Sequence, residues 1–138
     1  MANSIRDLMT SNPTTVQPST PVAQAAQIMK TEDAGAVPVV EGEQLVGMLT
    51  DRDITIRVVA EGKDPQTATV GEIASKQLVT LDPQQNVEEA VRLMAEHQVR
   101  RLPVVEEDGK LVGIVAQADV ARKADTAKTG QMVEEISQ

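Results

Sequence analysis

The chain has 138 residues, of which 41% are hydrophobic, and it carries a formal net charge of −8. It contains one His, no Cys and no Phe, Tyr or Trp, which excludes disulfides, zinc–thiolate sites and multi-histidine metal sites within a single chain. The acidic balance and the lack of aromatic rings for base stacking argue against nucleic-acid binding.

The first predicted elements are a short helix, a short strand and a longer helix. Ser4 is followed three residues later by Asp7, a capping-box pattern that opens a helix, and residues 14–16 form a β-prone run. In the longer helix, apolar residues recur at i, i+3, i+4 and i+7 and form one face. That face consists of Val22, Ala25, Ala26 and Met29.

Two strands and a final helix complete this half of the chain. The strands are predicted at about 36–41 and 44–50, joined by a hairpin-like link at residues 41–43, and the final helix begins near Asp51. We expect the strand at 36–41 to run parallel to the one at 14–16, because a helical crossover joins parallel strands. The two later strands form an antiparallel hairpin.

The second half of the chain repeats the first. GAVPVVEGEQLVGMLTDRD, residues 35–53, returns as RRLPVVEEDGKLVGIVAQAD, residues 100–119. A step of 65 carries Pro38 onto Pro103, and beyond the hairpin turn a step of 66 carries Asp53 onto Asp119. We therefore assign one repeat to residues 1–60, a connector to 61–68, a second repeat to 69–123 and a tail to 124–138.

The repeat predicts an α+β fold in which each half has the order α-β-α-β-β-α. Strands in the second half are expected at about 101–106 and 110–116, with a last helix from Gln117. A three-stranded sheet with two helices is small for an independent core. We therefore expect two pseudo-symmetric halves whose sheets pack face to face, with the helices outside and two clefts between the repeats.

The two ordered copies of Pro-Val-Val, Leu-Val-Gly and a terminal Asp resemble a tandem pair of CBS domains, also called a Bateman module. The stretches GMLTDRDI and HQVRRLPVV are similar to short stand-alone bacterial members of that family. The resemblance implies a regulatory module that binds an adenosine-type nucleotide, such as AMP, ADP, ATP or a related ligand, in the clefts between the repeats. It also implies a homodimer that signals to a partner protein and requires no cofactor.

In the first repeat the candidate ligand-binding residues are Thr50 and Asp53, where a strand ends and a helix begins. Unpaired N–H groups at a helix start suit a phosphate. The resemblance implies a phosphate contact for the Thr50 hydroxyl and a ribose contact for the Asp53 carboxylate. The same spacing also forms a capping box, and the sequence leaves both interpretations open.

In the second repeat Ala116 replaces the threonine, while Asp119 keeps the acid. Ala116 can neither cap a helix nor contact a phosphate through its side chain, so phosphate binding there depends on other groups. The retained acid fits ribose binding and equally fits a favourable interaction with the helix dipole.

Arg100 and Arg101 are the candidate phosphate ligands of the second repeat. They directly precede Leu102, and the resemblance implies a basic residue there facing a ligand phosphate, which a guanidinium can bind with two hydrogen bonds. The alternative is that both arginines are solvated or pair with nearby acids such as Glu96 or Glu106.

The adenine would be held by aliphatic side chains and backbone groups, because the chain has no aromatic ring. Val37 and Pro38 are the expected wall of one cleft, and Leu102 and Pro103 are the equivalent wall of the second. By resemblance, the backbone near residues 13–14 and 78–79 lines the other side. The alternative for these side chains is ordinary core packing.

No residue pattern indicates catalysis or metal binding. His97 is a lone histidine near a helix end, and the sequence contains no G-x-S-x-G, P-loop or H-E-x-x-H motif. We therefore expect no enzyme, and the competing function is a structural or protein-interaction module whose clefts stay empty.

The start of the chain lacks an export signal and no apolar run reaches the roughly 18–20 residues of a membrane span, which favours the cytoplasm and no membrane partner. The regulated effector would then be another chain.

Overall fold

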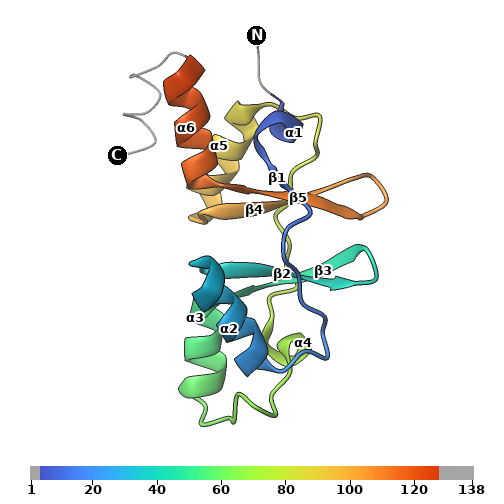
Figure 1. The fold of residues 1–138 in the computed structure, drawn as a ribbon, viewed down its shortest axis with the longest axis vertical. Helices are drawn as coiled ribbons and strands as arrows, with labels where there is room; N and C mark the ends of the chain where they lie inside the picture. Colours follow the sequence, from blue (N-terminus) through green and yellow to red (C-terminus); the bar gives the residue numbers. More distant parts are fainter. Residues whose placement is uncertain (1–3, 128–138) are drawn as a thin grey trace. The chain divides into compact units, whose positions relative to one another are not determined.

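The computed structural model describes the backbone of residues 4–127 and the side chains of residues 4–122. The chain divides into two compact units (Figure 1). The middle unit is Thr14–Leu78, and the terminal unit combines the described residues up to Pro13 with those from Val79 onward. No helix among the described residues is long and apolar enough to cross a membrane.

The middle unit is a two-stranded sheet with its helices. Its hairpin pairs β2 with β3 in antiparallel register, with a bulge between Val39 and Val40. A π-helical turn, η1, continues directly from α3. The elements are α2 (Val22–Glu32), β2 (Ala36–Glu41), β3 (Gln44–Thr50), α3 (Asp51–Ile54), η1 (Thr55–Val59) and α4 (Val70–Ile73).

The terminal unit has the same plan, but its sheet has a third strand, β1, where the middle unit has only the single bridge between Met48 and Ser75. Its sheet has the order β1-β5-β4, and both pairings are antiparallel. The predicted tail is partly helical, because α6 continues to Ala127; residues 128–138 lie outside the described part. The elements are α1 (Ile5–Leu8), β1 (Thr10–Ser11), α5 (Val87–His97), β4 (Arg101–Val105), β5 (Leu111–Ala116) and α6 (Gln117–Ala127).

The predicted parallel crossover is present in both units, although its first strand is only a single bridge. Val16 pairs in parallel with Val39, and Leu81 pairs in parallel with Val104. The Val16 N–H donates to the Pro38 carbonyl at 3.0 Å, and the Leu81 N–H donates to the Pro103 carbonyl at 2.9 Å. The prolines therefore accept from the parallel neighbour through the one backbone polar group that they retain.

The repeats matched in sequence are not the compact units in space, because the short helix at the start of each repeat packs in the unit of the other repeat. The α1 residue Ile5 donates its N–H to the Gln85 carbonyl at 2.7 Å, next to α5. In the middle unit the α4 residue Val70 makes the equivalent bond to Thr20, next to α2, at 2.8 Å. The two repeats thus exchange their first helices: α1 of the first repeat packs in the terminal unit, and α4 of the second repeat packs in the middle unit.

Each unit has its own hydrophobic core of aliphatic side chains, and in each the predicted helix face contributes to it. In α2, Val22, Ala25 and Met29 are buried and Ala26 is half-buried. The middle core contains Val16, Val22, Ala25, Met29, Val37, Val39, Leu49, Val58, Ala68, Val70, Ile73 and Ala74. The terminal core contains Ile5, Leu8, Leu81, Ala90, Met94, Leu102, Val104, Val115 and Val120.

A glycine allows the exchanged segment to approach the last strand of each hairpin. Ser11 lies opposite Gly113 in the β1–β5 pairing, and a Cβ on Gly113 would lie 2.9 Å from the Thr10 carbonyl oxygen and would also meet the Met9 side chain. In the middle unit, a Cβ on Gly47 would lie 3.0 Å from the Ser75 carbonyl oxygen. Because both contacts are with backbone, neither can be relieved by a side-chain rotation.

We expect Gly113→Ala to lower the free energy of unfolding by about 1–3 kcal/mol, as overpacking typically does, because the new methyl group forces β1 away from β5. Urea unfolding followed by circular dichroism measures this change. Ser11→Ala is the matched control, since Ser11 is exposed and surface substitutions usually stay within about 0.5 kcal/mol. Equal stability of Gly113→Ala and the wild type would contradict the close approach.

The short helix α4 is held at its start by a carboxylate. The Glu72 carboxylate accepts from the Thr69 N–H at 2.8 Å and from the Thr69 hydroxyl at 2.9 Å. These bonds, the backbone one first, lower the pKa of Glu72 below its ordinary value of 4.5. A lowered folded-state pKa stabilises the fold above the unfolded-state pKa, and this contribution is lost as the pH falls through the folded-state pKa.

We therefore expect Glu72→Gln to flatten the dependence of stability on pH below about pH 4.5. The variant is also expected to be less stable than the wild type at pH 7, where the charged carboxylate is the better acceptor. Urea unfolding at several pH values between 3 and 7 provides the measurement. Thr69→Val keeps the backbone donor and removes only the hydroxyl, so its pH profile should fall between the two. An unchanged slope in Glu72→Gln would contradict this role.

Candidate functional site

The predicted site residues lie at the open end of each hairpin, where its last strand leads into a helix. In the middle unit, Ala36 on β2 lies directly opposite Thr50 on β3. In the terminal unit, Arg101 on β4 lies directly opposite Ala116 on β5. Side chains directly opposite in an antiparallel pair lie on one face, with Cβ atoms about 4.5–5.5 Å apart. The two hairpins therefore present equivalent side-chain pairs with different chemistry.

A backbone hydrogen bond fixes the next residue in the same way in both units. The Asp51 N–H donates to the Gly35 carbonyl at 2.9 Å, and the Gln117 N–H donates to the Arg100 carbonyl at 2.7 Å. These bonds join the start of the last helix to the start of the hairpin. The positions that the sequence repeat aligns are thus equivalent in the structure as well.

Thr50 and Asp53 form a complete capping box at the start of α3. The Thr50 hydroxyl accepts from the Asp53 N–H at 3.1 Å, and the Asp53 carboxylate accepts from the Thr50 N–H at 3.0 Å. Both side chains are partly buried. The structure therefore brings the two predicted residues together and shows the capping interaction that the sequence also allowed.

Asp119 keeps half of this arrangement at the start of α6. Its carboxylate accepts from the Ala116 N–H at 2.9 Å and from the Arg122 guanidinium at 2.8 Å, and its side chain is 15% exposed. Arg122 was not among the site residues predicted from the sequence. The signal was the i,i+3 spacing between Asp119 and Arg122, which places the two side chains next to each other on one helix face.

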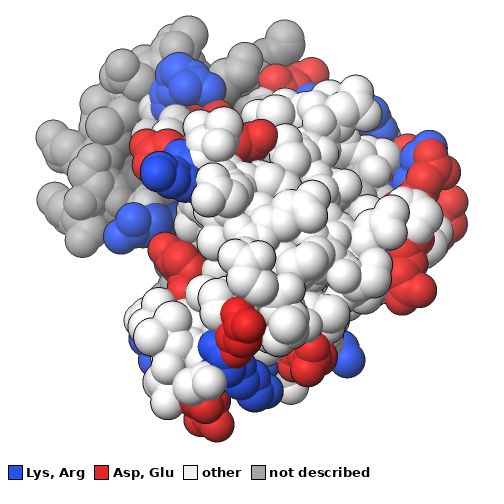
Figure 2. Space-filling model, turned by 60° about the horizontal axis from the view of Figure 1, so that its bottom comes forward, with Lys and Arg blue, Asp and Glu red and all other residues white. Residues whose placement is uncertain are grey.

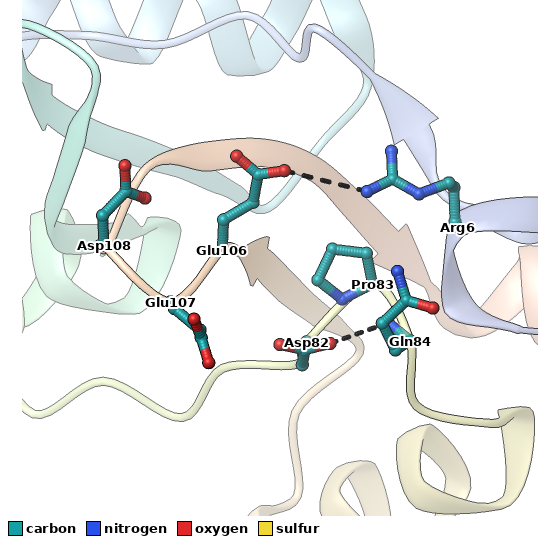
Figure 3. Close-up of a pocket in the computed structure, with 7 residues that line it drawn as sticks. All are labelled: Arg6, Asp82, Pro83, Gln84, Glu106, Glu107 and Asp108. Carbon is teal, nitrogen blue, oxygen red and sulfur yellow. Dashed lines mark hydrogen bonds and ion pairs between the residues drawn. The ribbon is translucent and has the colours of Figure 1, made fainter.

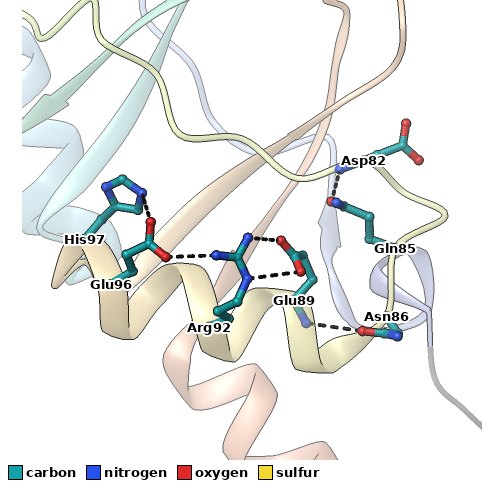
Figure 4. Close-up of polar contacts among 7 residues, drawn as sticks. All are labelled: Asp82, Gln85, Asn86, Glu89, Arg92, Glu96 and His97. Atoms are coloured by element: carbon teal, nitrogen blue, oxygen red, sulfur yellow. Dashed lines mark hydrogen bonds and ion pairs between the residues drawn. The ribbon is translucent and has the colours of Figure 1, made fainter.

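Arg100 is exposed and Arg101 is half-buried, and within the described part of the chain neither makes an ion pair. The acids proposed as alternative partners have other neighbours. Glu96 pairs with Arg92 at 2.8 Å and lies 3.6 Å from His97 (Figure 4).

Arg92 lies between two acids on α5. It also bonds Glu89, and this hydrogen bond lowers the pKa of the Glu89 carboxyl. Arg92 therefore holds the acids along this face of α5 together (Figure 4).

The side chains of the predicted adenine walls lie in two different environments. Val37 and Leu102 are 3% and 1% exposed and belong to the two hydrophobic cores. Because side chains alternate along a strand, Pro38 lies on the other sheet face, the one that carries Ala36. The side chains of Val37 and Leu102 therefore do not face a ligand on the side of Ala36 and Arg101, and Pro38 and Pro103, which lie on that side, are themselves buried.

A cavity of about 480 Å³ in the terminal unit lies away from these residues (Figure 3). Glu106 at its edge is 3.8 Å from Arg6. Four carboxylates and one arginine line it, a balance that would repel a phosphate. Its lining residues are Arg6, Asp82, Pro83, Gln84, Glu106, Glu107 and Asp108.

Across residues 4–122, no group of three or more His, Asp and Glu side chains is placed to hold a metal ion. His97, at the end of α5, is partly exposed and has Glu96 as its acidic neighbour. Carboxylates at the helix starts can accept from hydroxyl groups, and a hydroxyl or a guanidinium on the facing pair can bind an anion.

Comparison with known proteins shows the family. The chain matches the CBS domain at residues 5–60 and again at 70–125. It is 49% identical over 119 residues to the CBS domain-containing protein YhcV of Bacillus subtilis, covering 86% of this chain and 84% of that protein. It is 43% identical over 132 residues to hypoxic response protein 1 of Mycobacterium tuberculosis, covering 95% and 92%.

Solved structures agree with this assignment. A crystal structure of hypoxic response protein I with two coordinated zinc ions has a TM-score of 0.80 and 45% identity, covering 87% of this chain and 98% of that one. A crystal structure of CBSX2 in complex with AMP has a TM-score of 0.79 and 30% identity, covering 90% and 97%. The resemblance stated from the sequence is confirmed: this chain belongs to the CBS-domain family and is a tandem pair of CBS domains of α+β fold.

Proposed function

We propose that this CBS pair is a regulatory module that binds an adenosine-type nucleotide and passes the binding signal to a partner protein, and that it has no catalytic activity. The observation that carries the proposal is the repeated arrangement at the hairpin ends. In each unit an aspartate at a helix start lies beside a cross-strand pair that includes one side chain chemically able to bind a phosphate, Thr50 or Arg101. The complex of the similar protein CBSX2 with AMP supports this ligand class.

We define two half-sites by these residues. The middle half-site consists of Thr50 and Asp53 with the facing pair partner Ala36, and the terminal half-site consists of Arg101 and Asp119. In each, the aspartate carboxylate accepts from the ribose hydroxyls. The phosphate is bound by the Thr50 hydroxyl in one half-site and by the Arg101 guanidinium, assisted by the exposed Arg100, in the other.

The adenine is contacted by backbone groups and by proline side chains. Pro38 and its counterpart Pro103 lie on the sheet face of the half-sites, whereas Val37 and Leu102 contribute their backbone groups. An adenine edge carries both donors and acceptors, so backbone groups can recognise it without an aromatic side chain.

Binding would change existing contacts, which is how a ligand could regulate. In the middle half-site the Asp53 carboxylate and the Thr50 hydroxyl cap α3, and a ligand that recruits them replaces a cap of about 1 kcal/mol. In the terminal half-site the ligand would compete with Arg122 for Asp119. A ligand shifts a conformational equilibrium only by its differential affinity for the two states, and these replaced contacts are where the states would differ. We propose that a homodimer of this chain carries the response to an effector protein.

A second candidate function is a ligand-free protein-interaction module, and Ala116 favours it. At this position the terminal half-site lacks the hydroxyl that the middle one has, and Asp119 already has a backbone donor and an arginine as partners. Such a module would bind another protein and no nucleotide.

Calorimetric titration with AMP, ADP, ATP, NADH and S-adenosylmethionine separates the two functions. We expect at least one of these ligands to release or absorb heat saturably and to raise the melting temperature in a dye-based melt, which is needed because the chain lacks Trp and Tyr. A ligand at 100 times its Kd should stabilise the native state by about 2.7 kcal/mol. Absence of any response at millimolar ligand would favour the interaction module.

In the same titration we expect Asp119→Ala and Arg101→Ala to weaken binding to the terminal half-site. Loss of one hydrogen bond to a charged group corresponds to about 1.5–3 kcal/mol, or roughly tenfold or more in Kd. Arg6→Ala is the matched control, because Arg6 is exposed and belongs to neither half-site. Weakening by the control to the same extent would show that net charge, and no specific site, governs binding.

A further inference from the structure

We propose that the two half-sites select adenosine ligands by opposite charge. The terminal half-site takes a polyanionic ligand, a nucleoside di- or triphosphate. The middle half-site takes an adenosine whose 5′ substituent is neutral or cationic. This inference rests on the proposed function and narrows it: in the middle half-site the Thr50 hydroxyl contacts a neutral or cationic 5′ substituent, and only the terminal half-site binds phosphates.

The structure shows which positions of the two units are equivalent, independently of the sequence repeat. The pairs Ala36–Thr50 and Arg101–Ala116 occupy the same place in their ladders. The backbone bond from the first residue of the last helix to the start of the hairpin is present in both units. Differences between equivalent side chains are therefore differences at one place in two similar environments.

The charged groups at these positions differ in sign. The terminal half-site and its immediate neighbours include three arginines and one aspartate, a formal charge of +2: Arg100, Arg101, Arg122 and Asp119. The equivalent middle positions include one arginine and two aspartates, a formal charge of −1: Arg52, Asp51 and Asp53. The equivalents of the three arginines are Gly35, Ala36 and Ile56, none of which is charged.

The positive charge of the terminal half-site is available to a ligand. Arg101 is half-buried beside Ala116, whose small side chain leaves room on their shared sheet face, and Arg100 is exposed. Within the described part of the chain neither arginine is neutralised by an ion pair. A phosphate can therefore meet the Arg101 guanidinium, which binds phosphate oxygens in pairs, and the exposed Arg100 adds a second positive charge at the adjoining position.

A carboxylate takes the place of this charge in the middle half-site. A Cβ on Gly35 would lie only 3.2 Å from the Asp51 carboxylate oxygen, so the acid lies directly against the backbone at the position of Arg100. The equivalent of Asp51 in the terminal unit is the neutral Gln117. An extended polyphosphate would meet like charge at Asp51, whereas a cationic 5′ substituent would be attracted.

The face drawn in Figure 2 shows no extended basic patch that would give a competing explanation for anion binding. On the face drawn in Figure 2, Lys and Arg side chains lie in small separate groups, most of them beside Asp or Glu. The chain as a whole carries a charge of −8, so long-range attraction does not favour a polyanion. Any preference for more phosphates must come from local groups such as Arg100 and Arg101.

The test isolates each half-site and varies ligand charge. Asp53→Ala leaves the terminal half-site and Asp119→Ala leaves the middle one. Each variant is titrated calorimetrically with adenosine, AMP, ADP, ATP and S-adenosylmethionine, without divalent cations and at low and high salt. For Asp53→Ala we expect the affinity to rise on the order of tenfold from AMP to ATP, as one charge-assisted hydrogen bond provides, and to fall with salt. For Asp119→Ala we expect S-adenosylmethionine and adenosine to bind more tightly than ATP.

Two charge variants identify the residues responsible. Arg101→Gln in the Asp53→Ala background should remove the preference for ATP over AMP while AMP still binds. Asp51→Asn in the Asp119→Ala background should strengthen ATP binding and weaken S-adenosylmethionine binding. The same order of ligand affinities in both half-sites would overturn the inference while the proposed function stands. No binding of any ligand by the wild type would instead reject the proposed function, and the inference with it.

Discussion

The pairing between the last strand of each hairpin and a segment belonging to the other repeat is the constraint on which the rest of this structure depends. Met48 and Ser75 exchange two backbone hydrogen bonds, at 3.0 and 2.9 Å, and β1 pairs in the same way with β5. These contacts cover the outer edge of strands that would otherwise present unpaired backbone groups. They also hold each last strand on both sides, so the residue at its end, Thr50 or Ala116, has a fixed place. A recognition site at a strand end requires that rigidity.

An element of the fold can be predicted from the sequence where residues close together in the chain determine it, and cannot where contacts between distant residues do. The strands at 36–41 and 44–50 are observed as predicted, because β-prone apolar runs and a glycine turn mark them within a few residues. The crossover is parallel because one helix separates its strands. The exchange of α1 and α4 was not predictable, since the two helices have the same capping pattern and nearly the same apolar residues. A four-residue helix carries no signal for which hairpin it packs against; long-range backbone bonds decide it.

In the candidate site, too, features set by neighbouring residues could be predicted and features set by distant residues could not. The sequence predicted that Thr50 and Asp53 would lie together and left open whether they cap or bind; the structure shows the cap, and the ligand role remains a proposal. Period-two alternation could have indicated that Val37 points into the core with Val39, away from Ala36. The environment of Arg101 was beyond local reasoning, because it depends on the partner strand and on which acids other cations already engage. Glu96, a plausible partner by sequence distance, lies on α5 beside Arg92.

The pattern of divergence between the two repeats separates what the fold requires from what a ligand would require. Positions where the backbone or core allows one solution have the same residue in both copies: Gly47 and Gly113 at the strand crossing, Pro38 and Pro103 in the ladder, and an aspartate at each helix start. The positions that differ in charge, such as Ala36 and Arg101, or Ile56 and Arg122, are exposed or half-buried, so folding places little constraint on them. Yet most of the changes have the same sign. The positions of Gly35, Ala36, Asp51 and Ile56 each become more positive in the terminal unit, and only Arg52, whose equivalent is Ala118, changes the other way. Folding alone gives no reason for that bias, whereas two sites recognising differently charged ligands would produce it.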